Sequence, residues 1–153
     1  MTKKLSRVSE PTVALYQKAK MSVGDILRID LTDLDEPLSR LDTFRSGLDK
    51  SAFESFKALS GLDYETLADA LGVSAKTLQR KEVFDTGQSE KLYQLAELYA
   101  IGINYFGREG FRRWMERPLF TLGNRIPLDL IDVSEGISLL KTEILRLQHG
   151  IAV

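Results

Sequence analysis

The sequence predicts an all-α fold that is organised around a helix-turn-helix and followed by a second, smaller helical domain. Three observations predict this. Apolar residues recur at spacings of three and four along most of the chain, as they do on one face of a helix. Residues that start helices (Ser, Asp, Pro) precede these stretches, and glycines follow several of them. The stretch from Leu62 to Arg80 joins two such helices through Gly72.

The composition is that of an ordinary globular protein. The 153 residues are 43% hydrophobic and 28% charged, with a formal net charge of −1. Cysteine is absent and His149 is the only histidine, so thiolate metal sites, cysteine nucleophiles and an ordinary Ser/His/Asp triad are not expected. We expect no enzyme activity, no catalytic residue, no metal and no cofactor. Signal-peptide and membrane-spanning patterns are also missing, which predicts a cytoplasmic protein without a membrane partner.

Residues 1–47 are interpreted as an N-terminal arm and helix that could serve dimerisation. A proline predicts a short helix over residues 11–20. Apolar and polar residues alternate over residues 27–32, which favours a short strand, an extended segment or an arm exchanged between subunits. Pro37 then predicts the start of a helix that ends near Gly47. The apolar side of that helix would consist of Leu38, Leu41 and Phe44.

Residues 48–107 are predicted to form the helix-turn-helix domain. Spacings of four, four and three predict its first helix, with the apolar residues Leu48, Ala52, Phe56 and Leu59. Asp63 and Ser74 stand where a side-chain oxygen would accept the free backbone N–H groups at the start of the next two helices. Gly72 ends the first of the pair and allows a tight turn.

The second helix of this motif is the candidate DNA-reading element. Leu78 must face the core, which leaves the N-terminal edge of the helix facing outward. The candidate DNA-binding residues are Ser74, Ala75, Lys76, Thr77 and Arg80. The hydroxyl groups would hold phosphates and the basic side chains would reach bases. The alternative is a structural αα-hairpin without DNA contact, and the low net charge implies that DNA affinity would need a dimer.

A long helix is predicted to follow the motif and to close the core of this domain. It begins at Asp85, which forms a capping-box pattern with Gln88, and Gly107 ends it. Its apolar stripe consists of Leu92, Leu95, Ala96, Tyr99, Ile103 and Phe106.

Residues 108–153 are predicted to form the second domain. A short helix over 109–115 carries Phe111 and Trp114 as core anchors. An ordered apolar loop follows over 117–132, in which Pro127 opens a short helix.

The last predicted helix starts at a capping box of Asp132 and Glu135 and runs to about His149. It carries a heptad seam of Val133, Ile137, Leu140, Ile144, Leu147 and Ile151. We expect this seam to pack on the Trp114 helix or on a partner.

From about Leu48 onward the sequence resembles the Xre/MbcA/ParS family of antitoxins. The resemblance rests on Leu-x-x-x-Leu-Gly-Val-Ser-x-x-Thr-Leu-x-Arg at 67–80, on Trp114, on Gly-Asn-Arg-Ile-Pro-Leu-Asp-Leu at 123–130, and on the Glu-Gly pair at 135–136. It implies an Xre/Cro-like helix-turn-helix followed by a toxin-binding domain. Family members are encoded with RES-domain toxins that consume NAD or use it for ADP-ribosylation. The resemblance therefore implies an antitoxin that obstructs the toxin's NAD site, forms a hetero-oligomer with it, and represses its own operon as a dimer on operator DNA.

The predicted toxin-binding residues lie in the apolar loop and at the C-terminus. They are Asn124, Arg125, Leu128, Gly150, Ile151, Ala152 and Val153. Arg125 either ties the loop to helix ends or contacts the toxin. The tail carries no charged side chain and could enter an apolar cleft of the toxin, although terminal fraying would explain the same pattern.

Two other classes of function are open. A stand-alone dimeric repressor would explain Leu62 to Arg80 but would leave the residues after Gly107 without a task. A small enzyme fits least, because the residues for catalysis are scarce.

Overall fold

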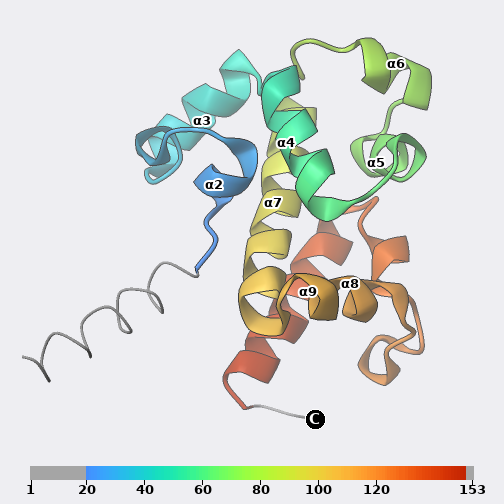
Figure 1. Ribbon diagram of the computed structural model, residues 1–153. Coiled ribbons are helices and arrows are strands. Elements are labelled where there is room, and N and C mark those ends of the chain that lie inside the picture. Colours follow the sequence, from blue (N-terminus) through green and yellow to red (C-terminus); the bar gives the residue numbers. More distant parts are fainter. Residues whose placement is uncertain (1–19, 151–153) are drawn as a thin grey trace, which may run out of the picture.

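The computed structural model describes residues 20–150, which fold around one long helix, α7 (Figure 1). The elements are α2 (Val23–Leu27), η1 (Leu31–Asp33), α3 (Pro37–Ser46), α4 (Lys50–Ser60), α5 (Tyr64–Leu71), α6 (Ala75–Arg80), α7 (Thr86–Phe106), α8 (Arg108–Glu116), η2 (Phe120–Leu122), η3 (Pro127–Leu130) and α9 (Ser134–Gln148), where η marks a 3₁₀ helix. Extended pairing within the described part of the chain is limited to two isolated β-bridges. The predicted all-α class is confirmed.

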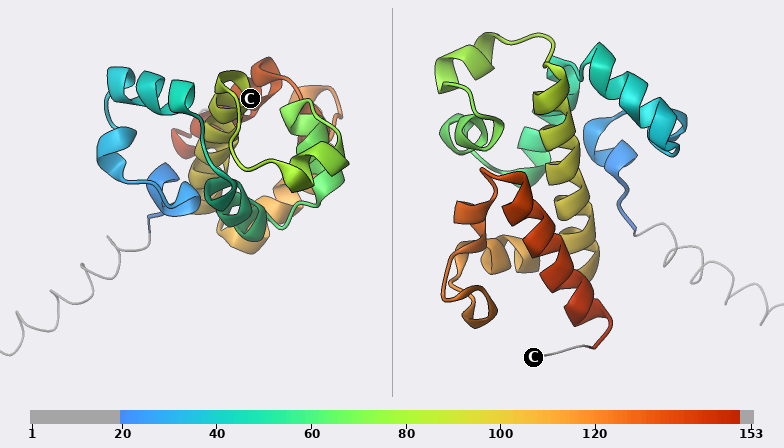
Figure 2. Two further views of the ribbon diagram at one scale, coloured as in Figure 1. Left: turned by 90° about the horizontal axis from the view of Figure 1, so that it is seen from above. Right: turned by 180° about the vertical axis from the view of Figure 1, so that it is seen from behind.

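Helix α7 is shared by the two halves of the molecule. The view from behind shows α2 to α6 around its upper part and α8 and α9 around its lower part (Figure 2). The predicted capping box forms, because Asp85 accepts from the N–H of Gln88 and the Gln88 side chain accepts in return. The predicted boundary at residue 107 falls at the end of α7, yet the core that α7 completes is continuous on both sides.

The prediction of a short strand at residues 27–32 is wrong. Ser22 caps α2 and forms a capping box with Asp25, so the chain is already helical before the alternating stretch begins. Ile26 and Leu27 are both buried, which a helix end permits and a strand with one buried face does not. The predicted helix over 11–20 lies outside the described residues, apart from Lys20 at its end.

Helix α3 has the predicted start and end, but only one of its three predicted apolar residues packs inward. Leu38 and Leu41 are exposed. Phe44 does pack inward, with its ring centroid 5.2 Å from that of Tyr93 on α7. Arg40, one turn before Phe44, also lies over Tyr93, and it donates to a backbone oxygen of the preceding loop. These two residues orient the helix and turn both leucines away from α7.

A short antiparallel contact joins the segment before α4 to the segment after α6. The N–H of Lys50 donates to the carbonyl of Glu82, and the N–H of Phe84 donates to the carbonyl of Leu48, each at 2.8 Å. The fully buried Ser89 hydroxyl accepts from the N–H of Leu48 at 2.9 Å. The predicted first helix therefore starts two residues later than its apolar pattern, at Lys50. Asp49 caps it.

Two predictions about α9 are wrong. The capping box of Asp132 and Glu135 does not form, because Val133 is the N-cap residue and no side chain accepts there. The backbone carbonyl of Asp132 instead accepts a hydrogen bond from the Lys91 ammonium group on α7. The heptad seam packs mainly along α7 rather than on the Trp114 helix. Three of its members are fully buried: Ile137, Leu140 and Ile144.

Candidate functional site

Helices α5 and α6 form the predicted helix-turn-helix with the predicted caps. Asp63 accepts from the N–H of Thr66 at 2.8 Å, and this hydrogen bond lowers the pKa of the Asp63 carboxyl group. Ser74 accepts from the N–H of Thr77 at 3.1 Å and donates to the Thr77 hydroxyl at 2.9 Å. Gly72 has the left-handed φ of 72° that the turn requires. The short helix α6 is thus fixed at its start by local hydrogen bonds.

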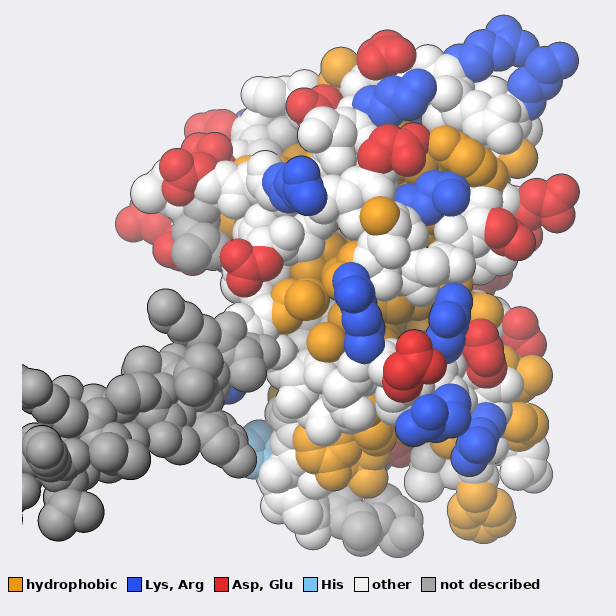
Figure 3. Space-filling view, viewed as in Figure 1, with side chains coloured by type: hydrophobic (Ala, Val, Ile, Leu, Met, Phe, Trp, Pro, Cys, Tyr) orange, Lys and Arg blue, Asp and Glu red, His pale blue; other side chains and the backbone are white. Residues whose placement is uncertain are grey.

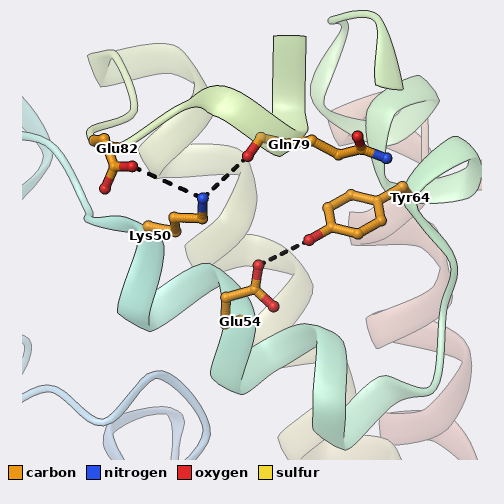
Figure 4. A network of polar contacts seen from close by, with 5 residues as sticks. All are labelled: Lys50, Glu54, Tyr64, Gln79 and Glu82. Atoms are coloured by element: carbon orange, nitrogen blue, oxygen red, sulfur yellow. Dashed lines mark hydrogen bonds and ion pairs between the residues drawn. The ribbon is translucent and has the colours of Figure 1, made fainter. Parts of the chain in front are cut away.

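Helix α4 holds the other end of α6 (Figure 4). The ammonium group of Lys50 donates to the carbonyl of Gln79 at 3.0 Å and lies 3.8 Å from the carboxylate of Glu82. On the same side of α4, Glu54 accepts from the Tyr64 hydroxyl at 2.9 Å, and this contact raises the pKa of Tyr64. These contacts hold α5 and α6 against one side of α4. They therefore orient α6 relative to the rest of the molecule.

Apart from Ala75, the predicted DNA-binding residues lie together on the outer side of α6. Leu78 is buried, as predicted, whereas Lys76, Thr77 and Arg80 are exposed. A shallow depression on this side is lined by Ser74, Lys76, Thr77, Arg80 and Lys81. It combines three cationic side chains with two hydroxyl groups, which suits a phosphate backbone. Ala75 is half-buried and packs toward the core.

The predicted toxin-binding loop is an ordered hairpin-like turn. The N–H of Leu119 donates to the carbonyl of Arg125 at 3.0 Å, and the N–H of Asn124 donates to the carbonyl of Leu119 at 2.8 Å. Gly123 and Asn124 both have positive φ, 65° and 62°, as in a type I′ turn. Asn124 and Arg125 are exposed. Within residues 20–150 the Arg125 guanidinium forms no ion pair or hydrogen bond, so the interpretation as a structural tie is not supported.

The remaining predicted toxin-binding residues are divided between two places. Gly150 follows the end of α9, at the same lower end of the molecule as the Asn124 turn (Figures 1 and 2). Leu128 is half-buried on η3 and lies in a cleft between the helix-turn-helix and the C-terminal region, which Asp69, Ser74 and Asp129 also line. Residues Ile151, Ala152 and Val153 lie outside the described part of the chain.

Sequence reasoning did not single out Phe120 on η2, which at 88% is the most exposed large apolar side chain among residues 20–150. It also did not single out Leu139 and Leu145 on α9, which are both exposed. A signal was available, because α9 contains more leucine and isoleucine than one buried seam needs.

Two further properties bear on the kind of site. Among residues 20–150, no group of three or more His, Cys, Asp or Glu side chains is placed to hold a metal ion. None of the helices described is long and apolar enough to span a bilayer.

Curated relatives of the chain are antitoxins. A protein named Prs ADP-ribosylating antitoxin from Sphingobium sp. (strain YBL2) is 25% identical over 128 residues, which cover 74% of this chain and 80% of the relative. Antitoxin Xre from Yersinia enterocolitica is 22% identical over 117 residues, covering 72% and 79% of the two chains. These relatives are named as antitoxins and not as enzymes, which agrees with the prediction that the chain is not an enzyme.

A solved structure has a similar fold. A chain in the crystal structure of the M. tuberculosis MbcT–MbcA toxin–antitoxin complex superposes with a TM-score of 0.52 and 23% identity, over 63% of this chain and 90% of that chain. Two family models also match. Residues 39–97 match the antitoxin Xre-like helix-turn-helix domain, and residues 102–150 match the antitoxin Xre/MbcA/ParS C-terminal toxin-binding domain. With both domains present in this order, the chain belongs to the Xre/MbcA/ParS family of antitoxins.

Proposed function

We propose that the protein neutralises a cognate NAD-consuming RES-domain toxin by blocking its active site, and represses its own operon through α6. The observation that carries the proposal is the presence of a helix-turn-helix and a toxin-binding domain on opposite ends of one shared helix, α7. This arrangement leaves α6 free for DNA while the lower end of the molecule is engaged by a partner. Both activities would take place in the cytoplasm, where the operator and the toxin's NAD are found.

The toxin-binding surface would consist of the lower-end residues together with the tail. Phe120 offers a large, highly exposed apolar side chain, and Arg125 on the neighbouring turn offers a cation that has no ion-pair partner among residues 20–150. Aromatic and arginine side chains of this kind commonly contribute most to a protein interface. The tail after Gly150 would enter the toxin's NAD-binding cleft, and inhibition would then need no chemistry by the antitoxin.

The DNA-binding surface would be the basic side of α6. Ser74 and Thr77 would position the helix on phosphates, and Lys76 and Arg80 would reach base edges. The small local charge and the net charge of −1 favour binding by two copies at two half-sites.

The test is a double dissociation in full-length protein. Arg80→Ala should weaken binding to DNA from upstream of the gene by about 1–3 kcal/mol if Arg80 contacts a base, and should leave rescue from the neighbouring gene's product intact. Phe120→Ser and deletion of 151–153 should do the reverse, by weakening rescue and the block of NAD consumption in vitro while keeping DNA binding. Arg146→Ala, which removes one exposed charge from α9, is the control for the change in net charge.

Three outcomes would count against the proposal. Unchanged DNA affinity in Arg80→Ala removes Arg80 as a contact. Full rescue by both toxin-side variants removes the lower end as the binding surface. A neighbouring gene whose product neither harms cells nor binds this protein would favour the stand-alone repressor.

A further inference from the structure

A narrow cavity lies where the two halves of the molecule meet, between the end of α4, α7 and α8. It holds about 50 Å³ and opens to solvent, and this is the space of about three or four water molecules. Figure 3 shows apolar surface between the lower end of α4 and α8, with charged side chains around it. The apolar part of the lining consists of Leu59, Leu62, Ile103, Phe111, Met115 and Leu128.

The Tyr99 side chain on α7 forms a polar part of the lining. It is only 5% exposed, and its ring packs edge-on against Phe56 and Phe111 at centroid distances of 5.1 and 4.9 Å. Burial raises the pKa of Tyr99 well above its usual value, Glu116 raises it further and Arg112 lowers it, so the hydroxyl keeps its proton. No group within residues 20–150 accepts a hydrogen bond from it. A buried donor needs an acceptor, and a molecule that enters the cavity can supply one.

Three charged side chains of α8 line the same cavity at spacings of four: Arg108, Arg112 and Glu116. All three are exposed, and none forms an ion pair within the described part of the chain. The Arg112 guanidinium lies against the backbone of Gly61, where an added Cβ would be 2.8 Å from its Nη2 atom. Since Arg112 and Glu116 both change the pKa of Tyr99, these three groups surround one space. The net charge of the lining is +1.

We propose that this cavity binds a small monocarboxylate with an apolar body. The carboxylate accepts hydrogen bonds from the Tyr99 hydroxyl and the Arg112 guanidinium, which are both donors without a partner among residues 20–150. The apolar body contacts the leucine and methionine side chains of the lining. Glu116 limits the positive charge, so the site favours one negative charge and disfavours a phosphate dianion.

The cavity is built by both domains of the chain. Residues 59–62 belong to the helix-turn-helix match, and residues 108–128 belong to the match with the C-terminal domain. A ligand in the cavity therefore contacts both domains at once and stabilises their junction. This binding site goes beyond the proposed antitoxin and repressor activities and rests on neither of them.

Titration of the full-length protein, without DNA or toxin, with benzoate, benzamide and phosphate tests the proposal. Trp114 is the only tryptophan, and its ring centroid lies 5.9 Å from that of Phe111 in the lining, so the NMR signal of its indole N–H reports on the cavity. Benzoate should shift this signal saturably, with a roughly millimolar Kd for so small a ligand. Benzamide has nearly the same shape without the charge, and it should bind at least about tenfold more weakly, as should phosphate. Equal binding of benzamide, or no saturable shift with benzoate, would overturn the proposal.

Substitutions in the lining identify the donors. Tyr99→Phe and Arg112→Gln should each weaken benzoate binding at least about fivefold, because each removes one donor to the carboxylate. The matched controls Tyr105→Phe and Arg113→Gln change exposed residues outside the lining and should leave the Kd unchanged. Glu116→Gln should strengthen binding, because it removes a negative charge near the ligand.

Thermal unfolding separates binding from a structural role of the Tyr99 hydroxyl. Without benzoate, Tyr99→Phe should melt no lower than the wild type, because the hydroxyl has no partner within the described chain to lose. With benzoate, the melting temperature of the wild type should rise, and that of Tyr99→Phe should rise less. A large drop for Tyr99→Phe without benzoate, or weaker benzoate binding by Glu116→Gln, would contradict the proposed arrangement.

Discussion

The helix-turn-helix and the C-terminal region use different means to define where their helices begin. In the helix-turn-helix and its flanking helices, every start is capped by a side chain, supplied by Asp49, Asp63, Ser74 and Asp85. In the C-terminal region, α8, η2, η3 and α9 have no side-chain cap. Contacts with α7 and between neighbouring segments define these helices instead. The first region is therefore encoded mainly in local sequence and the second mainly in packing.

Gly136 illustrates the second case. It lies in the first turn of α9, and a Cβ atom there would overlap the carbonyl oxygen of Leu130 at the end of η3. The absence of a side chain lets η3 abut the start of α9. Local capping chemistry plays no part in this arrangement, which explains why the Asp132–Glu135 pattern misled the prediction.

The largest expected effect is that the same substitution, glycine to alanine, changes the free energy of unfolding in opposite directions at two positions. Gly136→Ala should destabilise the protein by about 1–3 kcal/mol, because backbone atoms must move to admit the methyl group. Gly87→Ala, in the first turn of α7, meets only ordinary contact at 3.7 Å and should stabilise by about 0.5–1 kcal/mol through the higher helix propensity of alanine. Denaturant unfolding of both variants measures this. Equal changes in the free energy of unfolding for the two variants would show that packing does not distinguish the C-terminal region from the helix-turn-helix.

A smaller effect is expected from a cap in the first region. Ser74→Ala removes the side-chain acceptor for the N–H of Thr77 and should cost about 1 kcal/mol of unfolding free energy. Ser51→Ala, an exposed serine in the first turn of α4, is the matched control and should be close to neutral. Hydrogen exchange should locate the change at α6. An effect spread evenly over α9 as well would contradict the local origin of this helix.

The smallest effect concerns acid stability. The pKa of Asp63 is lowered by its capping hydrogen bond to the N–H of Thr66, so the folded state favours the ionised carboxylate. The ionised Asp63 carboxylate therefore contributes to the free energy of unfolding. This contribution is fully present above the unfolded-state pKa and is lost as the pH falls through the lower folded-state pKa. Asp63→Asn keeps a capping oxygen but cannot titrate. The difference in stability between wild type and this variant should therefore shrink in acid, and a difference that is constant with pH would remove Asp63 as the titrating group.

The sequence by itself determined the all-α class, the helix-turn-helix with its caps at Asp63 and Ser74, the start of α7 and the inward position of Leu78. All of these depend on hydrogen bonds or spacings within a few residues, which the sequence displays directly. The resemblance identified the family because its motifs stand in a fixed order and at fixed spacings in the sequence. The DNA-binding and toxin-binding residues stay predictions, although the structure places most of the former on one exposed surface.

Tertiary structure alone decided the features that depend on distant residues. Leu38 and Leu41 face outward because Arg40 and Phe44 pack on Tyr93, about fifty positions later in the chain. Tertiary structure also packed α9 on α7 and left Phe120 exposed on an ordered turn. A helical spacing of apolar residues indicates that one side of a helix is apolar, but it does not indicate which neighbouring element will cover that side. That choice depends on which contacts bury the most surface with every polar group paired, and it is made only when the whole chain has folded.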